Sequence, residues 1–410
     1  MTSAQLIALG HAALERAHEL ILLGGALGML SILAGLISRR VGAPMLLVFL
    51  GLGMLAGEDG ILGVPYDDFT SAYSIGSVAL AVILFEGGLK TPVYMLRLAF
   101  WPAALLATIG VAVTAVVLGM FVALVDGVPL VAGLLAGAAA APTDAAAVAV
   151  LLRRAGAALP ERLLAALEIE SGLNDPMSVF LTFLLLHIIV APDSVGIWGA
   201  VLLFIEEMAG GAVLGLASGS LLAQSLKHLP LESSLAPVLV LTGGLTIFGL
   251  AQLLGTSGFL AIYLAAVVTG ATAHRAKQDV EHFFEGMAWL AQIVLFLMLG
   301  LLVTPHELPP YLLGAIIGAV VLILLARPVA VFACLLPFGF SWRETTFASW
   351  VGLRGAVPIY LSIIPALADP HRDQRLFASI FILVIASLIV QGWTVGAAAR
   401  LLGFARQLES

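Results

Sequence analysis

The sequence predicts an all-α polytopic membrane protein with about thirteen transmembrane helices, and three features of the chain support this fold class. First, 61% of the 410 residues are hydrophobic and only 10% are charged, whereas about a quarter of the residues of a soluble domain are charged. Second, apolar stretches of about 15 to 25 residues recur between short polar loops, which is the length that spans hydrocarbon. Third, basic residues gather in every second loop. A soluble protein is thereby excluded.

Two of the thirteen predicted segments, the fifth and the twelfth, are interrupted. The first interruption is Ala141-Pro142-Thr143 and the second is Gly352-Leu353-Arg354-Gly355. Proline cannot donate a backbone hydrogen bond and disfavours helix at the residue before it. We therefore expect two discontinuous transmembrane helices. The segments begin near Glu19, Ala43, Tyr73, Leu98, Leu130, Arg162, Trp198, Leu235, Gly258, Phe283, Tyr311, Arg343 and Leu376.

The loops alternate in charge along the chain. One set of loops holds Arg39, Arg40, Lys90, Arg97, Arg153, Arg154, Arg162, Lys227, Arg275, Lys277 and Arg343, and Arg400 and Arg406 follow the last segment. The intervening loops hold Glu58, Asp59, Asp67, Asp68, Asp126, Asp193 and Glu307, with Arg16, Arg372 and Arg375 as their only basic residues. The positive-inside rule then predicts an N-terminus outside and a C-terminus in the cytoplasm of a cell whose inner membrane holds the protein.

The chain also contains a weak internal repeat at an offset of about 213 residues. At this offset Thr91-Pro92 falls on Thr304-Pro305, and Gly87 falls on Gly300. Because matched segments lie seven spans apart, an odd number, the two halves must be inverted in the membrane. The sequence predicts one transmembrane unit, 1–410, with a first inverted repeat and linker helix in 1–213 and a second repeat in 230–400. Inverted repeats with broken helices are typical of transporters.

Five charged side chains are predicted to lie within the membrane. Counted at about 1.5 Å per helical residue, Asp144, Glu170, Arg327 and Arg354 lie about 12 to 16 Å from the cytoplasmic ends of their segments. Asp175 lies deeper, at about 20 Å. Ionisable groups at such depths indicate function by default. Two cations cannot offset three carboxylates, so one carboxylate needs a proton or a transported cation.

The depth of each charged residue in the membrane indicates which residues can pair. Glu170 and Arg327 match most closely, which predicts a structural ion pair. No basic residue shares the depth of Asp175, so this carboxylate is predicted to bind cation and proton in competition. The alternative is a permanently protonated acid that donates to a backbone carbonyl. Asn174 is predicted to orient the site or to bond Glu170, although a simple interhelical bond explains it equally well.

The two interruptions offer further ligands. Carbonyls freed by Pro142 and the Thr143 hydroxyl are hard oxygen donors suited to an alkali ion, with a simple proline kink as the alternative. Arg354 is predicted to neutralise Asp144 or the helix ends that meet there, unless its side chain extends to the interface. Glu86 lies about 6 Å from the inner end of its segment and lines a cytoplasmic funnel or is merely interfacial.

Four motifs resemble the cation:proton antiporter-1 family. They are Ala-Pro-Thr-Asp-Ala-Ala-Ala-Val (141–148), Glu-Ser-Gly-Leu-Asn-Asp-Pro (170–176), Ala-Arg-Pro (326–328) and Gly-Leu-Arg-Gly-Ala-Val-Pro (352–358). The likeness is strongest to the bacterial NhaP type, in particular its potassium/proton antiporter branch. The Asn-Asp pair in its helix is the specific signal, and the resemblance covers nearly the whole chain.

This resemblance implies an NhaA-like fold of thirteen helices, divided into a core domain with two crossed unwound helices and a dimerisation domain. It implies Asp175 as the exchanging carboxylate, helped by Thr143, Ser171, Asp144 and possible assistance from Glu86. It also implies the Glu170–Arg327 salt bridge, a homodimer and alternating access. Members of this branch often have a cytoplasmic regulatory domain, which we do not expect in this chain.

The sequence therefore predicts a secondary active antiporter rather than an enzyme, with membrane lipids around it and no nucleic-acid partner. We expect electroneutral one-for-one exchange of K⁺, or alternatively Na⁺, for H⁺, in a role in pH homeostasis. No cofactor and no metal beyond the transported alkali ion is implied. Two other classes stay open, a cation channel and an intramembrane aspartyl protease that would use Asp144 and Asp175 as a dyad. The protease lacks support because no Gly-x-Gly-Asp setting is present.

Overall fold

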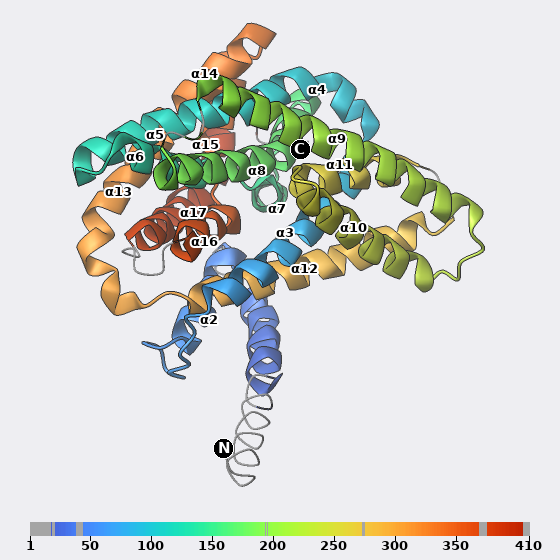
Figure 1. Cartoon of the computed structure of the whole chain (residues 1–410), viewed down its shortest axis with the longest axis horizontal. Coiled ribbons are helices and arrows are strands. Elements are labelled where there is room, and N and C mark those ends of the chain that lie inside the picture. The colour runs from blue at the N-terminus through green and yellow to red at the C-terminus, as the bar shows by residue number, and fades with distance from the viewer. Residues whose placement is uncertain are drawn as a thin grey trace, which may run out of the picture.

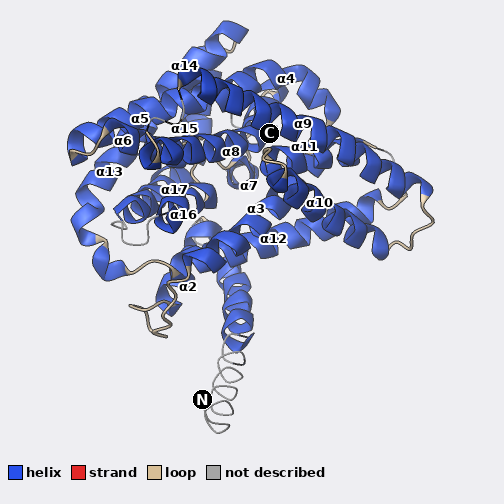
Figure 2. Cartoon of the chain, in the orientation of Figure 1, coloured by secondary structure: helices blue, strands red, loops and turns tan. Residues whose placement is uncertain are grey.

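The computed structural model describes residues 18, 21–37, 44–192, 194, 196–272, 275–368 and 375–404. These residues form helices joined by short loops (Figures 1 and 2). Eight helices are long and apolar enough to cross a membrane, and a ninth span consists of two helices bent by 45°. With four shorter apolar helices, the described segments follow the order of the thirteen predicted ones. The predicted all-α membrane fold is confirmed.

The helix bounds agree with the predicted segments. A first helix covers Ile21–Ile37. The first half then contains α2 (Met45–Ala56), α3 (Phe69–Lys90), α4 (Val93–Leu105), α5 (Val111–Asp126), α6 (Leu130–Ala140), α7 (Ala145–Ala155) and α8 (Glu161–Val190). The second half contains α9 (Ile197–His228), α10 (Leu235–Leu253), α11 (Gly258–Ala271), α12 (Lys277–Leu301), α13 (Leu312–Val321), α14 (Arg327–Leu335), α15 (Trp342–Trp350), α16 (Ala356–Ala368) and α17 (Arg375–Leu401).

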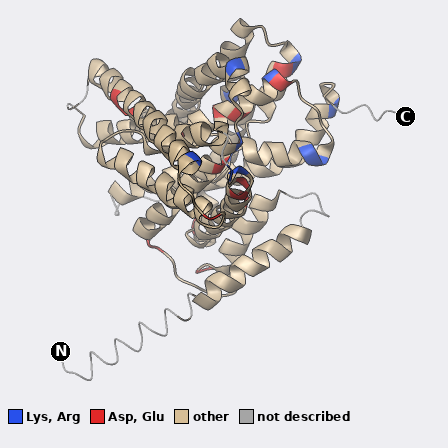
Figure 3. Cartoon of the chain, turned by 90° about the vertical axis from the view of Figure 1, so that its right-hand side faces the viewer, with Lys and Arg blue, Asp and Glu red and all other residues tan. Residues whose placement is uncertain are grey.

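Several predicted positions lie outside the described residues. They are the segment starts Glu19 and Ala43, the basic residues Arg16, Arg39, Arg40, Arg372 and Arg406, and the acid Asp193. Charged residues occupy few positions on the helices that are described (Figure 3). The basic ends Lys90, Arg153 with Arg154, Lys227 and Arg400 fall in the last turns of α3, α7, α9 and α17.

Two prolines change the helix geometry around the core. Pro328 follows Arg327 at the start of α14, and Pro102 lies near the end of α4. A proline inside a helix removes one hydrogen bond and clashes with the carbonyl four residues earlier. Wider π-helical turns, at Leu322–Ala326 before α14 and at Leu106–Gly110 after α4, lie beside them. Such single π turns are frequent at functional sites, and the first of them sets the position of Arg327.

The helices pack in two groups. The helices α4 to α8 pack with α13 to α17, and we call these ten the core group. The helices α2, α3 and α9 to α12 pack with one another, and we call them the scaffold group. Fewer contacts join the groups, mainly those of α16 with α3 and α12 and of α8 with α11. In Figure 1, α12 runs below α16 and α17, and α3 packs against it.

The scaffold group contains two helix crossings that correspond at the offset of the repeat. In the crossing of α2 with α12, Gly300 lies against the Leu50 carbonyl. In the crossing of α11 with α3, Gly88 lies against the Tyr263 carbonyl. Tyr263 corresponds to Leu50, and Gly88 is one residue from the partner of Gly300. At both crossings the backbones approach so closely that a side chain would clash, which is why glycine is needed.

Candidate functional site

Polar side chains gather where the two broken helices meet α8. The first break lies between Ala140 and Ala145, and the second lies between Trp350 and Ala356. The backbone N–H of Asp144 donates to the Leu353 carbonyl at 2.8 Å, so the unwound segments are bonded directly to each other. An unwound segment cannot pair its own backbone N–H and C=O groups, so each break provides hydrogen-bond partners for the backbone of the other.

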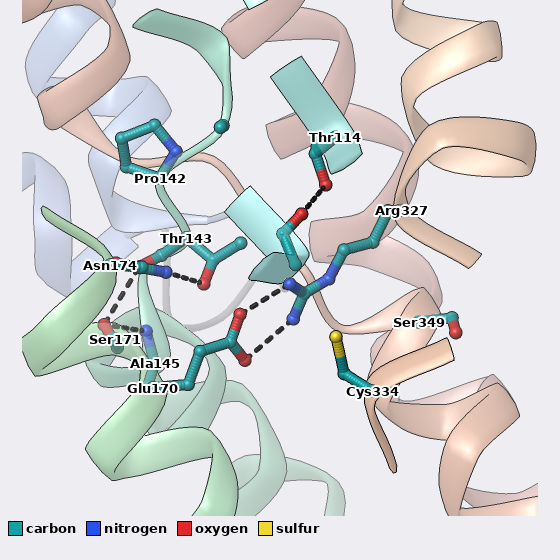
Figure 4. Close-up of polar contacts among 12 residues, drawn as sticks. Thr114, Pro142, Thr143, Ala145, Glu170, Ser171, Asn174, Arg327, Cys334 and Ser349 are labelled. Atoms are coloured by element: carbon teal, nitrogen blue, oxygen red, sulfur yellow. Dashed lines mark hydrogen bonds and ion pairs between the residues drawn. The ribbon is translucent and has the colours of Figure 1, made fainter. Parts of the chain in front are cut away.

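In the first break, the side chains of α8 hold the unwound backbone. Ser171 Oγ donates to the Thr143 carbonyl at 2.9 Å and accepts the Ala145 N–H at 3.1 Å. Asn174 Nδ2 donates to Thr143 Oγ1 at 2.7 Å (Figure 4). The amide of Asn174 therefore bonds Thr143, and among the described residues no hydrogen bond joins it to Glu170, the one partner that the sequence suggested by name. Thr143, Ser171 and Asn174 form one hydrogen-bonded unit.

The carboxylate of Asp144 caps the helix that follows the break. Its Oδ1 accepts the Ala147 N–H at 2.9 Å, at the N-terminus of α7. An acid in this position satisfies a free N–H and lies at the positive end of the helix dipole. The side chain is only partly buried and faces the cavity described below. The negative charge of Asp144 is thus partly offset by the backbone of α7.

Arg354, in the second break, binds the C-terminal end of α6, where the first break begins. Its Nη1 donates to the carbonyls of Ala141 and, at 2.8 Å, Pro142, which are free because α6 has ended. The side chain is 1% exposed, so it does not extend to the interface. The guanidinium lies at the negative end of the α6 dipole. Of the predicted roles for Arg354, the structure therefore shows contact with the helix ends.

The glycines on either side of Arg354 have a steric reason. A Cβ on Gly355 would lie 2.6 Å from Asp144 Oδ2, and a Cβ on Gly352 would lie 2.7 Å from Arg327 Nε. Both distances are shorter than any ordinary Cβ contact. Because these two residues lack a Cβ, the second break can pack closely against Asp144 through Gly355 and against Arg327 through Gly352.

Glu170 and Arg327 lie together in the core group. Nη1 and Nη2 of Arg327 donate to Oε1 and Oε2 of Glu170 at 2.5 and 2.9 Å, in a bidentate geometry (Figure 4). Both residues are almost completely buried. The pair joins α8 to α14, and it offsets one of the three carboxylates. Breaking such a pair leaves a buried charge without compensation.

Asp175 is the carboxylate for which the described residues supply no such compensation. It is 5% exposed, and its Oδ1 has no hydrogen-bond partner within the described ranges. Asp144 acts on it as a nearby like charge. Pro176 follows it and has no N–H, so the Gly172 carbonyl lacks its usual helical donor. A buried carboxylate that has an oxygen without a partner is suited to hold a proton or a cation.

Asp175 lines a cavity of about 340 Å³ between the two helix groups. Thr143, Asp144 and Ser171 also line it, as do the basic residues at the ends of α3 and α7. The cavity therefore extends from the breaks to the side of the basic loops. Glu86 is in this wall, where it pairs with Lys90 at 2.5 Å. Among the described residues no hydrogen bond or ion pair joins Glu86 to Asp175, so the two line the same cavity without direct contact.

Two cavity residues were not singled out from the sequence. Glu168 lies in the wall on α8, and the ring of Tyr263 packs against Gly172 from α11. The signal for Glu168 was its spacing, because positions 168, 171 and 175 share one helical face. Glu168 was overlooked because it lies close to the basic end of α8. Tyr263 had no sequence signal, because its contact depends on how α11 packs.

The chain matches known proteins over most of its length. Residues 28–401 match the sodium/hydrogen exchanger transmembrane family. The K(+)/H(+) antiporter NhaP2 of Shewanella sp. (strain ANA-3) is 44% identical over 386 residues, which cover 94% of this chain and 67% of that protein. The K(+)/H(+) antiporter NhaP of Alkalimonas amylolytica is 42% identical over 387 residues, with the same two shares.

A solved structure shares the fold. The sodium proton antiporter MjNhaP1 from Methanocaldococcus jannaschii at pH 8 matches with a TM-score of 0.83 and 23% identity, over 94% of this chain and 99% of that one. The resemblance inferred from the four motifs is confirmed by these matches. The chain therefore belongs to the sodium/hydrogen exchanger family.

Proposed function

We propose that this protein is a secondary active antiporter that exchanges a monovalent cation for a proton, with Asp175 as the exchanging group. The observation that supports this most directly is the buried carboxylate of Asp175, whose Oδ1 has no hydrogen-bond partner among the described residues, in a cavity at the crossing of two broken helices. Membership of an exchanger family agrees with it. A transporter of this kind performs no covalent chemistry, so no enzymatic step is proposed.

The charge balance of the site explains how exchange works. Arg327 offsets Glu170, the N-terminus of α7 offsets Asp144, and Arg354 offsets the C-terminus of α6. Asp175 remains, and a buried carboxylate must be neutralised by a proton or a cation. When Asp175 faces one side it releases a proton and binds the cation. After the core group moves, a proton on the other side displaces the cation.

We assign the cation ligands to oxygens around Asp175. Its own carboxylate, the Thr143 carbonyl and hydroxyl, Ser171 Oγ and the carboxylate of Asp144 are hard donors of the kind alkali ions prefer. Asn174 positions Thr143 by its hydrogen bond. Glu86 lines the path to the site rather than the site itself. Glu170 and Arg327 hold α8 and α14 together and do not take part in the exchange.

We propose electroneutral one-for-one exchange, because one titrating carboxylate carries either one proton or one monovalent cation. A substitution at Asn174 tests this stoichiometry. Replacing it (Asn174→Asp) places a second acid beside Asp175, which should make transport sensitive to membrane potential. Potential-sensitive flux through the unmodified protein would contradict the proposed stoichiometry.

Potassium is the favoured cation and sodium the alternative. The two relatives described above are named as K(+)/H(+) antiporters, and this is what supports potassium here. We further propose that the protein resides in the cell inner membrane with its N-terminus outside and its C-terminus in the cytoplasm, as the basic loops predict. The cavity then opens to the cytoplasm. A homodimer, formed through the scaffold group, completes the proposal.

The test is proton flux in sealed proteoliposomes with an imposed pH gradient. K⁺, Na⁺ and Li⁺ are added separately to the unmodified protein and to Asp175→Asn. We expect one of these cations to collapse the gradient with the unmodified protein and none to do so with the variant. Equal flux through both proteins would overturn the role of Asp175. Flux far above that of an exchanger would favour a channel, and cleavage of a helical peptide without flux would favour a protease.

A further inference from the structure

The polar face of α8 extends beyond Asp175 toward the basic side of the molecule. Glu168, Ser171 and Asp175 lie three and four residues apart, and all three line the same cavity. Residues at this spacing share one face of a helix. Glu168 lies seven residues before Asp175, which is about 10.5 Å along the helix axis. Along this face of α8, a cation that enters from the basic side therefore reaches Glu168 before Asp175.

The surroundings of Glu168 differ from those of Glu86, another acid in the wall of the cavity. Glu86 is paired with Lys90 at 2.5 Å. Arg153 on α7 is the cation whose charge reaches Glu168, but among the described residues no ion pair within 4 Å joins them. Glu168 is half-buried. Tyr263, which belongs to the scaffold group, lines the same cavity. The carboxylate of Glu168 therefore lines the cavity without a basic side chain in contact with it among the described residues.

We propose that Glu168 is a vestibule acid, which attracts the cation into the cavity and passes it to Asp175 without being the exchanging group. An acid in a narrow cleft with apolar walls raises the local concentration of cations, and hence their rate of arrival. Half-burial at Glu168 leaves more room for a hydrated cation than the site at Asp175, which is 5% exposed. This inference rests on the proposed function and adds a residue to its path.

The experiment separates binding from turnover. Cation-dependent proton flux is measured over a range of K⁺ concentrations in inside-out vesicles, so that K⁺ is added on the side of the basic loops. For Glu168→Gln we expect the KM for K⁺ to rise roughly threefold to tenfold with little change in maximal rate. Higher ionic strength should reduce the difference, because a surface field is screened. Glu168→Asp keeps the charge and should keep the KM near that of the unmodified protein.

The matched control is Glu161→Gln, which removes the same charge from the exposed start of α8, away from the cavity. If Glu168→Gln and Glu161→Gln give the same KM, the inference is wrong while the proposed function stands. A loss of maximal rate at unchanged KM, in both Glu168 variants, would instead assign a structural role and also overturn it. If the unmodified protein shows no cation-dependent flux, the proposed function fails and the inference fails with it.

Discussion

In the first helix break an acid, Asp144, caps the N-terminus of α7. In the second break a basic residue, Arg354, donates hydrogen bonds to the carbonyls at the C-terminus of α6, which ends in the first break. The backbone device is the same in both, but the chemistry is opposite. Both helix ends of the first break receive a complementary charge. The second break contributes the glycines that permit close approach and one guanidinium. Under the proposed function, the first break offers oxygen ligands to the cation, and the second break supports the first through Arg354.

The largest expected effect comes from the ion pair that lies beside the second break. Arg327→Ala leaves Glu170 buried without a partner, and we expect a loss of about 3–5 kcal/mol in the free energy of unfolding. Thermal unfolding in detergent measures it. The double change Glu170→Leu with Arg327→Met should recover most of the stability, because no buried charge is left. If the double variant is as unstable as the single one, packing rather than charge is responsible.

The comparison between the breaks is tested most directly by exchanging their charges for neutral groups. Arg354→Ala leaves the Ala141 and Pro142 carbonyls unsatisfied, at a cost of about 1.5–3 kcal/mol for a charged hydrogen bond. Asp144→Ala removes a helix cap, at a cost of about 1 kcal/mol, but should strongly reduce cation exchange. Stability and flux are measured for both variants. A more unstable Asp144 variant, with flux intact, would reverse the assignment of the two breaks.

A smaller effect is expected from the close approach of the breaks. Gly355→Ala places a methyl group against Asp144, and we expect destabilisation of about 1–3 kcal/mol by overpacking, together with slower exchange. Gly87→Ala is the matched control, because no atom lies within 4 Å of a Cβ at that position. Equal Tm values for the two variants would show that the breaks can separate freely.

The smallest effect concerns an ion pair outside the membrane, which contrasts with the buried one. His306 Nδ1 lies 2.6 Å from Asp59 Oδ2, in the loops after α12 and α2. The hydrogen bond to Asp59 raises the pKa of His306 above 6.5, and the bonds from His306 lower the pKa of Asp59 below 3.8. Both groups are exposed, so the pair contributes little.

The sign of its pH dependence follows from these shifts. The contribution of His306 is complete below pH 6.5 and is lost as the pH rises through its raised pKa, while that of Asp59 is lost as the pH falls through its lowered pKa. His306→Gln should therefore lower the Tm slightly near pH 5 and leave it unchanged near pH 9. A larger difference at pH 9 would show that the contact does not depend on charge.

Much of this molecule could be predicted before its structure. Hydropathy alone determined the number and order of the spans, because lipid requires apolar segments of a defined length. The charges that interrupt those segments identified Asp175, Glu170 and Arg327, since ionisable groups at that depth are rare. Counting residues from helix ends brought Glu170 and Arg327 to one level, and the structure joins them.

The remaining contacts depended on packing. The sequence left open whether Asn174 bonds Glu170 and whether Arg354 reaches Asp144, the helix ends or the interface, because a helix fixes depth but not which neighbour lies across from it. The cavity and the role of Glu168 in its wall depend on the spacing of the two helix groups. Tyr263 against Gly172 has no counterpart in local sequence, because the residues come from helices in different groups.

By itself, the sequence determined that the chain forms membrane-spanning helices, that two of them break, and that Asp175 lies deep in the membrane with no basic residue at its level. These follow from the cost of polar groups in lipid, which acts on each segment separately. Only the tertiary structure decided that the breaks bond to each other and that Arg354 serves the helix ends. Those outcomes depend on backbone groups and a guanidinium that lie more than two hundred residues apart in the chain, and no local rule determines the distances between them.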